Sequence, residues 1–190
     1  VLEGLLKRGI LESYEKEVGR LQVSVCRLQE PNPLSPAQEK AYGEIHEAFK
    51  TKEVCLLHGV TSSGKTEIYV RLIHEVLRLG RQVLYMLPEI AITTQITERL
   101  AKLFGDKLLV YHSKFSDNER VEVWNKLLHN DEPMLVLGVR SSLFLPFKDL
   151  GLIIVDEEHE NTYKQQDPAP RYHARNAALV LAGMHGAKTL

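Results

Sequence analysis

Short apolar runs alternate along this chain with longer stretches whose apolar residues recur every three or four positions. Apolar runs of four to six residues are typical of strands buried on both faces of a sheet. The runs are EVCLLH (53–58), QVLYML (82–87), LLVYH (108–112), MLVLG (134–138) and GLIIV (151–155). The stretches with helical period are 65–79, 94–104 and 117–129. Strands that alternate with helices predict an α/β fold, a mostly parallel sheet with helices on both faces.

Residues that typically start or end helices occur at the boundaries of the predicted helices. Ser35 can cap a helix, Pro36 suits its first turn, and Gln38 can complete a capping box. Gly80 can end the first of the three later helices, and Ser116, with a glutamate three residues on, can start the third. Right-handed crossovers would then place the loops that follow the strands along one edge of the sheet, where ligands bind.

The first 30 residues have a different pattern. Leucines at helical spacing, then Gly9, then an alternating run at 21–28 are compatible with the end of a winged-helix module. PNPLSP (31–36) holds three prolines and is typical of a linker. We therefore expect a winged-helix tail at 1–30 and the main domain at 31–190.

Composition excludes few classes of protein. The 190 residues are 44% hydrophobic and 26% charged, with a net charge of −1, so total charge does not by itself indicate a nucleic-acid partner. No apolar run approaches the ~20 residues of a membrane helix. Cys26 and Cys55 lie far apart, which favours reduced core cysteines over a zinc site or disulfide. Trp124 is expected in the core; the histidines expected at the surface are His46, His74 and His129.

The segment GVTSSGKT after the first apolar run has the spacing of a phosphate-binding loop. Its glycines let backbone amides turn toward phosphates, and the following helix adds the positive end of its dipole. Lys65 can reach the β and γ phosphates, and the Thr66 hydroxyl can bind Mg²⁺. The expected nucleotide-binding residues of this loop are Gly59, Val60, Thr61, Ser62, Ser63, Gly64, Lys65 and Thr66.

An acidic cluster ends the last apolar run, in GLIIVDEEHE (151–160). An acid at the end of a strand beside a phosphate loop can hold Mg²⁺, and the next acid can orient or deprotonate an attacking water. We assign Asp156 to the metal and Glu157 to the water. The alternative is a solvated acidic loop. The presence of a phosphate loop and of a buried strand directly before the acids favours the functional interpretation.

The motifs together resemble the superfamily 2 helicases, and within them the DEAH-type helicases that restart stalled replication forks in bacteria. The resemblance covers essentially all of 34–190. It is carried by GVTSSGKTEIY (59–69), PEIAIT (88–93), YHSKFSDNERVEVW (111–124), GVRSSLFLPF (138–147), DEEHENTYKQQ (156–166) and RYHARNAA (171–178).

This resemblance implies a RecA-like P-loop NTPase lobe, the first of two in a motor driven by ATP and Mg²⁺. It implies that Gln38 reads the adenine edge, although its side chain could simply close the capping box. It also implies that His159 relays between the acidic cluster and a DNA-sensing loop that follows. The residues expected at DNA or in coupling are Thr93, Thr94, Arg140, Ser141, Ser142, Tyr163, Lys164, Arg171, Tyr172, His173 and Arg175. Their alternatives are helix capping for the threonines, a surface ion pair for Arg140, packing for the tyrosines, and a plain surface helix from His173 to Ala182.

For the parent protein, the resemblance implies 3′-to-5′ unwinding of DNA, binding of single-stranded and forked DNA, and partners that assemble the primosome and load the replicative helicase. It places the protein in the bacterial cytoplasm, associated with the nucleoid and not with a membrane. A Ser-Ala-Thr motif, zinc-binding cysteines and a second lobe with an arginine finger are expected beyond this segment, which itself has no structural metal. The alternatives are a nucleotide- or DNA-binding module without turnover, and a P-loop phosphotransferase.

Overall fold

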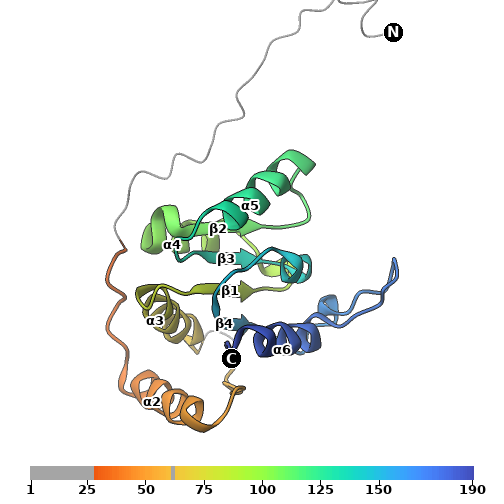
Figure 1. Cartoon of the computed structure of the whole chain (residues 1–190). Coiled ribbons are helices and arrows are strands. Elements are labelled where there is room, and N and C mark those ends of the chain that lie inside the picture. The colour runs from red at the N-terminus through yellow and green to blue at the C-terminus, as the bar shows by residue number, and fades with distance from the viewer. Residues whose placement is uncertain (1–27, 61–62) are drawn as a thin grey trace, which may run out of the picture.

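The computed structural model describes residues 28–60 and 63–190 as a parallel sheet enclosed by helices (Figure 1). The strands are β1 (Gln82–Met86), β2 (Leu108–Tyr111), β3 (Leu135–Gly138), β4 (Leu150–Val155) and β5 (Lys188–Thr189). The helices are α2 (Pro36–Thr51), α3 (Lys65–Arg78), α4 (Thr94–Phe104), α5 (Asp117–His129) and α6 (Ala174–His185). Single 3₁₀ turns are η1 (Glu89–Ala91), η2 (Gly105–Lys107), η3 (Arg140–Phe144) and η4 (Asn161–Tyr163).

The five strands lie in the order β2-β3-β1-β4-β5, and each pair is parallel. In the register between the two central strands, Tyr85 lies beside Ile154 and Met86 beside Val155. All strands therefore end at the same edge of the sheet, and the loops after β1, β3 and β4 meet there (Figure 1).

Two apolar layers pack on the two faces of the sheet, as the unbroken apolar runs predict. Leu84 and Met86 of β1 face one layer, which contains residues of α5 and α6. Val83 and Tyr85 face the other, which contains residues of α2, α3 and α4. Successive side chains of a strand point to opposite faces, so one short strand supplies both layers of the core.

The caps and helices confirm the sequence prediction closely. Ser35 accepts from the backbone of Gln38, whose side chain accepts from Ser35 N at 2.8 Å. The same box forms between Ser116 and Glu119, and Gly80 follows α3 with a φ of 82°. These signals are local, and no tertiary contact overrides them.

The predicted strand at 53–58 is the main difference. Only Val54 makes a bridge, to Thr189 of β5, flanked by hydrogen bonds from Cys55 N to Thr189 O and from Thr189 N to Glu53 O, both 2.9 Å. Because β5 is two residues long, the rest of the apolar run has no strand beside it. The tail expected at 1–30 lies outside the described residues, apart from 28–30, which form no helix or strand.

Two further expectations are wrong. Trp124 is 43% exposed, because α5 contacts the core through Val123 and Leu127, and the indole lies beside this buried strip, toward solvent. His74 is only 4% exposed, because its side of α3 faces α2 and the segment that precedes α2, at Glu30 and Pro31. Within the described residues, no helix is long and apolar enough to cross a membrane.

Candidate nucleotide site and adjoining interface

The phosphate loop joins the segment after Val54 to α3. Gly64 has a φ of 81°, a left-handed conformation that glycine adopts without strain. Its carbonyl accepts a hydrogen bond from Gln38 Nε2 at 3.1 Å, and a Cβ at Gly64 would lie 2.5 Å from that nitrogen. Gln38 therefore both closes the capping box of α2 and holds the loop. Val60 is 77% exposed, and its carbonyl accepts from Ser63 N at 3.2 Å; Thr61 and Ser62 lie outside the described residues.

Lys65 is the first residue of α3 and projects across the loop. Its Nζ donates to Gly59 O at 3.0 Å and lies 3.4 Å from Glu157 Oε1. An ammonium at this position of the loop can donate charge-assisted hydrogen bonds to the oxygens of a phosphate chain. The contact also shows that the phosphate loop and the acidic cluster, 92 residues apart in sequence, form one site.

Asp156 follows the last residue of β4 and is held by tyrosine hydroxyls. Tyr85 donates to Oδ2 at 3.0 Å and Tyr69 donates to Oδ1 at 3.3 Å. Burial raises the pKa of the Asp156 carboxyl, and the hydrogen bond from Tyr85 opposes that rise. Burial also raises the pKa of both phenols, with the Asp156 charge adding to the rise, so they remain donors.

Glu157 is in an unusual backbone conformation. Its φ is 49°, in the left-handed region, which costs a residue with a Cβ about 1 kcal/mol or more. Such conformations are concentrated at functional sites, where the surroundings impose them. The side chain of His159 is largely exposed, with Nε2 3.8 Å from Glu157 Oε2, while the neighbouring Glu158 pairs with Arg175 at 2.6 Å.

The residues present fit a magnesium–nucleotide group. Mg²⁺ prefers oxygen ligands and is commonly bound by one or two protein groups together with substrate phosphates. Within the described residues the Thr66 hydroxyl makes no hydrogen bond, and Asp156 offers a carboxylate oxygen. No cluster of three or more His, Cys, Asp or Glu suited to a metal occurs in that part of the chain.

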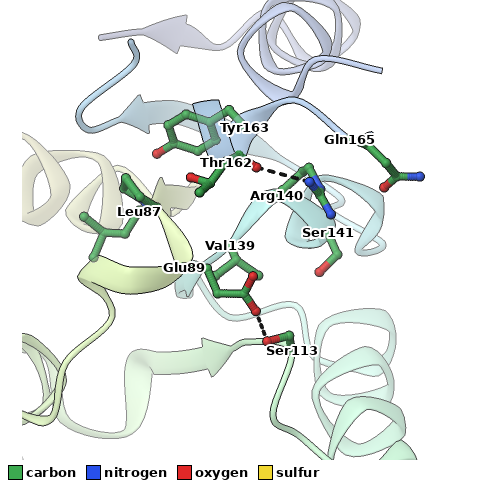
Figure 2. A pocket seen from close by; sticks show the side chains of 10 residues that line it. Leu87, Glu89, Ser113, Val139, Arg140, Ser141, Thr162, Tyr163 and Gln165 are labelled. Atoms are coloured by element: carbon green, nitrogen blue, oxygen red, sulfur yellow. Dashed lines mark hydrogen bonds between the residues drawn. The ribbon is translucent and has the colours of Figure 1, made fainter. Parts of the chain in front are cut away.

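A small cavity of about 80 Å³ lies at the same edge of the sheet, between the loops after β1, β2, β3 and β4 (Figure 2). Its lining residues are Leu87, Pro88, Glu89, Ser113, Val139, Arg140, Ser141, Thr162, Tyr163 and Gln165. Arg140 donates from Nη1 to the carbonyls of Thr162 and Lys164, at 3.1 and 3.2 Å. The guanidinium thus joins η3 to the loop after β4. Glu89, on the other side of the cavity, accepts a hydrogen bond from Ser113.

The loop between β4 and α6 projects beyond the edge of the sheet (Figure 1). Tyr163 is 1% exposed, and its hydroxyl donates to Asp156 O at 2.7 Å and Met86 O at 3.1 Å. It therefore cannot stack on a base, and the packing alternative is correct for its ring. Tyr172 is half-buried and meets the exposed Phe144 edge-to-face, at 5.2 Å between ring centres.

The basic residues of this loop mostly contact the loop itself. Lys164 Nζ donates to Arg171 O, and Arg171 Nε donates to Gln166 O at 2.8 Å. His173 and Lys164 form an antiparallel bridge that closes the loop. Nδ1 of His173 is buried without a hydrogen-bond partner in the described part of the chain.

Four other predicted contacts differ in how far they can reach DNA. Thr93 caps α4 by accepting from Ile96 N at 3.4 Å, as the alternative predicted, whereas Thr94 is exposed on the first turn. Ser141 lines the cavity and is exposed. Ser142 is fully buried, with Oγ donating to Val139 O at 2.6 Å, so direct contact with DNA is closed to it.

Sequence reasoning missed Tyr69 and Tyr85 as site residues. Both follow the apolar period of their elements and were indistinguishable from core residues. The usable signal is chemical, because a buried phenol requires an acceptor and the acidic cluster is the nearest source of one.

Residues 35–182 match the sequence pattern of the DEAD/DEAH box helicases, and the chain belongs to this family. It is similar to the replication restart protein PriA of several bacteria. It is 42% identical to PriA of Bacillus subtilis (strain 168) over 188 residues, covering 97% of this chain and 23% of the relative. It is 42% identical to PriA of Synechocystis over 179 residues, covering 93% and 21%. PriA of Haemophilus influenzae is 45% identical over 151 residues, covering 78% and 20%.

A solved structure supports the fold. The chain resembles the ATP-dependent Type ISP restriction-modification enzyme LlaBIII bound to DNA with a TM-score of 0.52 and 19% identity, over 85% of this chain and 12% of that one. The lobe is therefore of the RecA-like helicase type. The chain spans between a fifth and a quarter of the length of the curated relatives named above.

Proposed function

We propose that this chain is the first ATP-binding motor lobe of a bacterial replication-restart helicase of the PriA type. The observation that carries the proposal is the contact between Lys65 of the phosphate loop and Glu157 of the acidic cluster. It brings the group suited to bind phosphates within reach of the group suited to orient the attacking water.

The residues divide the work of ATP hydrolysis as follows. The loop from Gly59 to Thr66 binds the phosphates through Lys65 and its backbone, and Gln38 contacts the adenine edge. Bound Mg²⁺, held by Thr66 and Asp156, would neutralise phosphate charge. Glu157 accepts a proton from the attacking water, and the exposed His159 transmits the state of the acidic cluster to the loop that follows.

DNA binding is proposed for the edge where the loops after β1, β3 and β4 meet. Exposed donors at this edge are Thr94, Ser141, Arg171 and Arg175, with Lys164, His173 and Tyr172 partly accessible. Arg140 and Tyr163 have a different part: they join the loop after β4 to η3 and to the Asp156 backbone, which suits coupling between DNA and the ATP site. The partners proposed for the whole protein are single-stranded and forked DNA and the proteins of primosome assembly and helicase loading.

Two alternatives are weighed by separate observations. Because the chain spans at most about a quarter of the named relatives, it could bind nucleotide or DNA without turnover. A phosphotransferase is disfavoured by membership in the DEAD/DEAH box family. Transfer of labelled γ-phosphate to water or to an added acceptor separates hydrolysis from phosphotransfer.

The test is titration calorimetry of Mg·ATP on this chain and its Lys65→Ala variant. We expect the variant to lose at least about tenfold in affinity, because a hydrogen bond to a charged group contributes about 1.5–3 kcal/mol. Lys102→Ala, an exposed lysine on α4, is the matched control and should bind as the wild type does. Equal affinity in the Lys65→Ala variant would contradict the proposal.

Turnover and polarity are tested next. ATP hydrolysis by this chain is measured with and without single-stranded DNA, and unwinding by the whole protein is measured on duplexes with a 3′ or a 5′ tail. We expect unwinding only with the 3′ tail; unwinding from the 5′ tail would contradict the proposed direction. Hydrolysis by the 190-residue chain that single-stranded DNA stimulates would contradict the need for the second lobe.

A further inference from the structure

Both carboxylate oxygens of Asp156 accept hydrogen bonds from buried phenols. Tyr85 donates to Oδ2 at 3.0 Å and Tyr69 donates to Oδ1 at 3.3 Å. The backbone N–H of Glu157 also donates to Oδ1, at 3.1 Å. The carboxylate is therefore held on three sides by groups that belong to three different elements.

The two phenols are themselves rigidly placed. Tyr85 is 1% exposed on β1, the strand that pairs with β4, and Asp156 N donates to Met86 O at 3.0 Å. Tyr69 is buried on α3, one turn beyond the phosphate loop. Their rings pack edge-to-face with centres 5.6 Å apart. Neither ring can turn away without disturbing the core, so packing sets the position of each phenol oxygen beside the carboxylate.

Counting acceptor positions shows what this arrangement leaves free. An ionised carboxylate has two oxygens with about four lone-pair positions in all. The three donors use both positions on Oδ1 and one on Oδ2. One position on Oδ2 remains.

We propose that Tyr85, assisted by Tyr69, is a positioning residue that fixes the Asp156 carboxylate so that one lone pair of Oδ2 is available to a divalent cation. The inference rests on the proposed function of Asp156 as a magnesium-holding residue. Groups that hydrogen-bond a metal-binding carboxylate orient it, and their loss typically weakens metal binding by about 10- to 100-fold.

Tyr163 shows that a phenol buried at this site need not contact the Asp156 carboxylate. Tyr163 is as deeply buried and lies beside the same residue, but its hydroxyl donates to the backbone carbonyls of Asp156 and Met86. Its neighbours thus satisfy a buried phenol without using the carboxylate. Tyr85 and Tyr69 are directed at the carboxylate itself.

The experiment compares Tyr85→Phe with the wild-type chain, using Mn²⁺ and ATP as probes. Free Mn²⁺ is measured by electron paramagnetic resonance, and ATP binding in EDTA is measured by calorimetry. We expect Mn²⁺ binding in the presence of ATP to weaken at least about tenfold. ATP affinity in EDTA should change by less than about twofold, because the phenol does not belong to the phosphate loop. Tyr69→Phe, which loses the longer hydrogen bond, should fall between Tyr85→Phe and wild type.

Tyr42→Phe is the matched control, because Tyr42 also donates to a carboxylate, that of Glu75, away from the site. It should leave Mn²⁺ binding at the wild-type value. Equal Mn²⁺ affinity in Tyr85→Phe and wild type, or an equal loss in Tyr42→Phe, would overturn the proposal.

A metal-free readout keeps the proposal separate from the proposed function. Crystal structures of the wild-type and Tyr85→Phe chains in EDTA report the orientation of the Asp156 carboxylate directly. We expect one orientation in the wild type and a rotated or divided one in the variant; an unchanged orientation overturns the proposal. If wild-type binding of ATP does not depend on Lys65, the proposed function fails, yet this comparison still decides whether Tyr85 positions the carboxylate.

Discussion

Lys65 and Glu157 form an ion pair across the nucleotide site, with Nζ 3.4 Å from Oε1. The phosphates of a nucleotide would compete with this carboxylate for the same ammonium. We therefore expect Glu157→Gln to bind ATP more tightly, by up to about fivefold, since a partly exposed ion pair contributes up to about 1 kcal/mol. Turnover by the whole protein should fall by about 100-fold or more, because the water loses its base.

Calorimetry on this chain measures the binding part of that prediction, and Glu158→Gln is its control. Glu158 pairs with Arg175 and not with Lys65, so its variant should bind ATP as the wild type does. Weaker ATP binding by Glu157→Gln would show that the carboxylate does not compete for Lys65.

The backbone at Glu157 gives a prediction about stability. With a φ of 49°, Glu157 is in a region that glycine tolerates and alanine does not. We expect Glu157→Gly to be more stable than Glu157→Ala by about 1 kcal/mol in urea unfolding. At Glu158, whose φ is not positive, the order should reverse, with alanine more stable. If alanine were more stable than glycine at both positions, Glu157 would carry no strain.

Gly64 gives a second stability prediction. Gly64→Ala would place a methyl group 2.5 Å from Gln38 Nε2 at a φ of 81°, so we expect it to lower the free energy of unfolding by about 1–2 kcal/mol. Gly43→Ala, in the open middle of α2, should raise the free energy by about 0.5–1 kcal/mol. Urea unfolding measures both. A neutral Gly64→Ala would mean that Gln38 moves aside at no cost.

His74 makes stability depend on pH. Burial lowers its pKa, and Arg78 and Arg71 of its own helix lower it further, against an opposing effect of Glu30. As pH falls below about 6.5, the unfolded chain takes up a proton that the folded chain does not, so the free energy of unfolding falls until the lower folded pKa is passed. We expect His74→Leu to flatten this fall. Unfolding curves from pH 7.5 to 5.5 measure it, and parallel pH dependence in the two chains would contradict the prediction.

Local signals explain why so much of the architecture was predictable. The capping boxes at Ser35 and Ser116 and the left-handed Gly80 are encoded within a few residues, and each helix begins or ends where they indicate. The strand at 53–58 failed because strands depend on partners distant in sequence, and β5 offers a partner only to Val54.

The candidate site divides in the same way. The phosphate loop and the acidic cluster are contiguous motifs, and the structure brings Lys65 to Glu157 as their chemistry requires. The role of Arg140 could not be read from its neighbours, because its partners are carbonyls more than 20 residues away. The expectation for Trp124 failed for another reason. The apolar residues of α5 form a broad stripe, and the helical period does not say which edge of it is buried: Val123 and Leu127 are, whereas Val121, Trp124 and Leu128 are exposed.

The position of β5 between its two neighbours has a consequence for how the site is kept in alignment. Thr189 lies beside Ile153 of β4 on one side and beside Val54, ahead of the phosphate loop, on the other. β5 thus separates the backbone ahead of the phosphate loop from the backbone of β4, which ends at Asp156. Two strands with a third between them lie about 10 Å apart. β5 therefore sets the distance between the phosphate loop and the end of β4. A bulge or a register slip in β5 would change the distance from Lys65 to Asp156 without altering any reactive side chain.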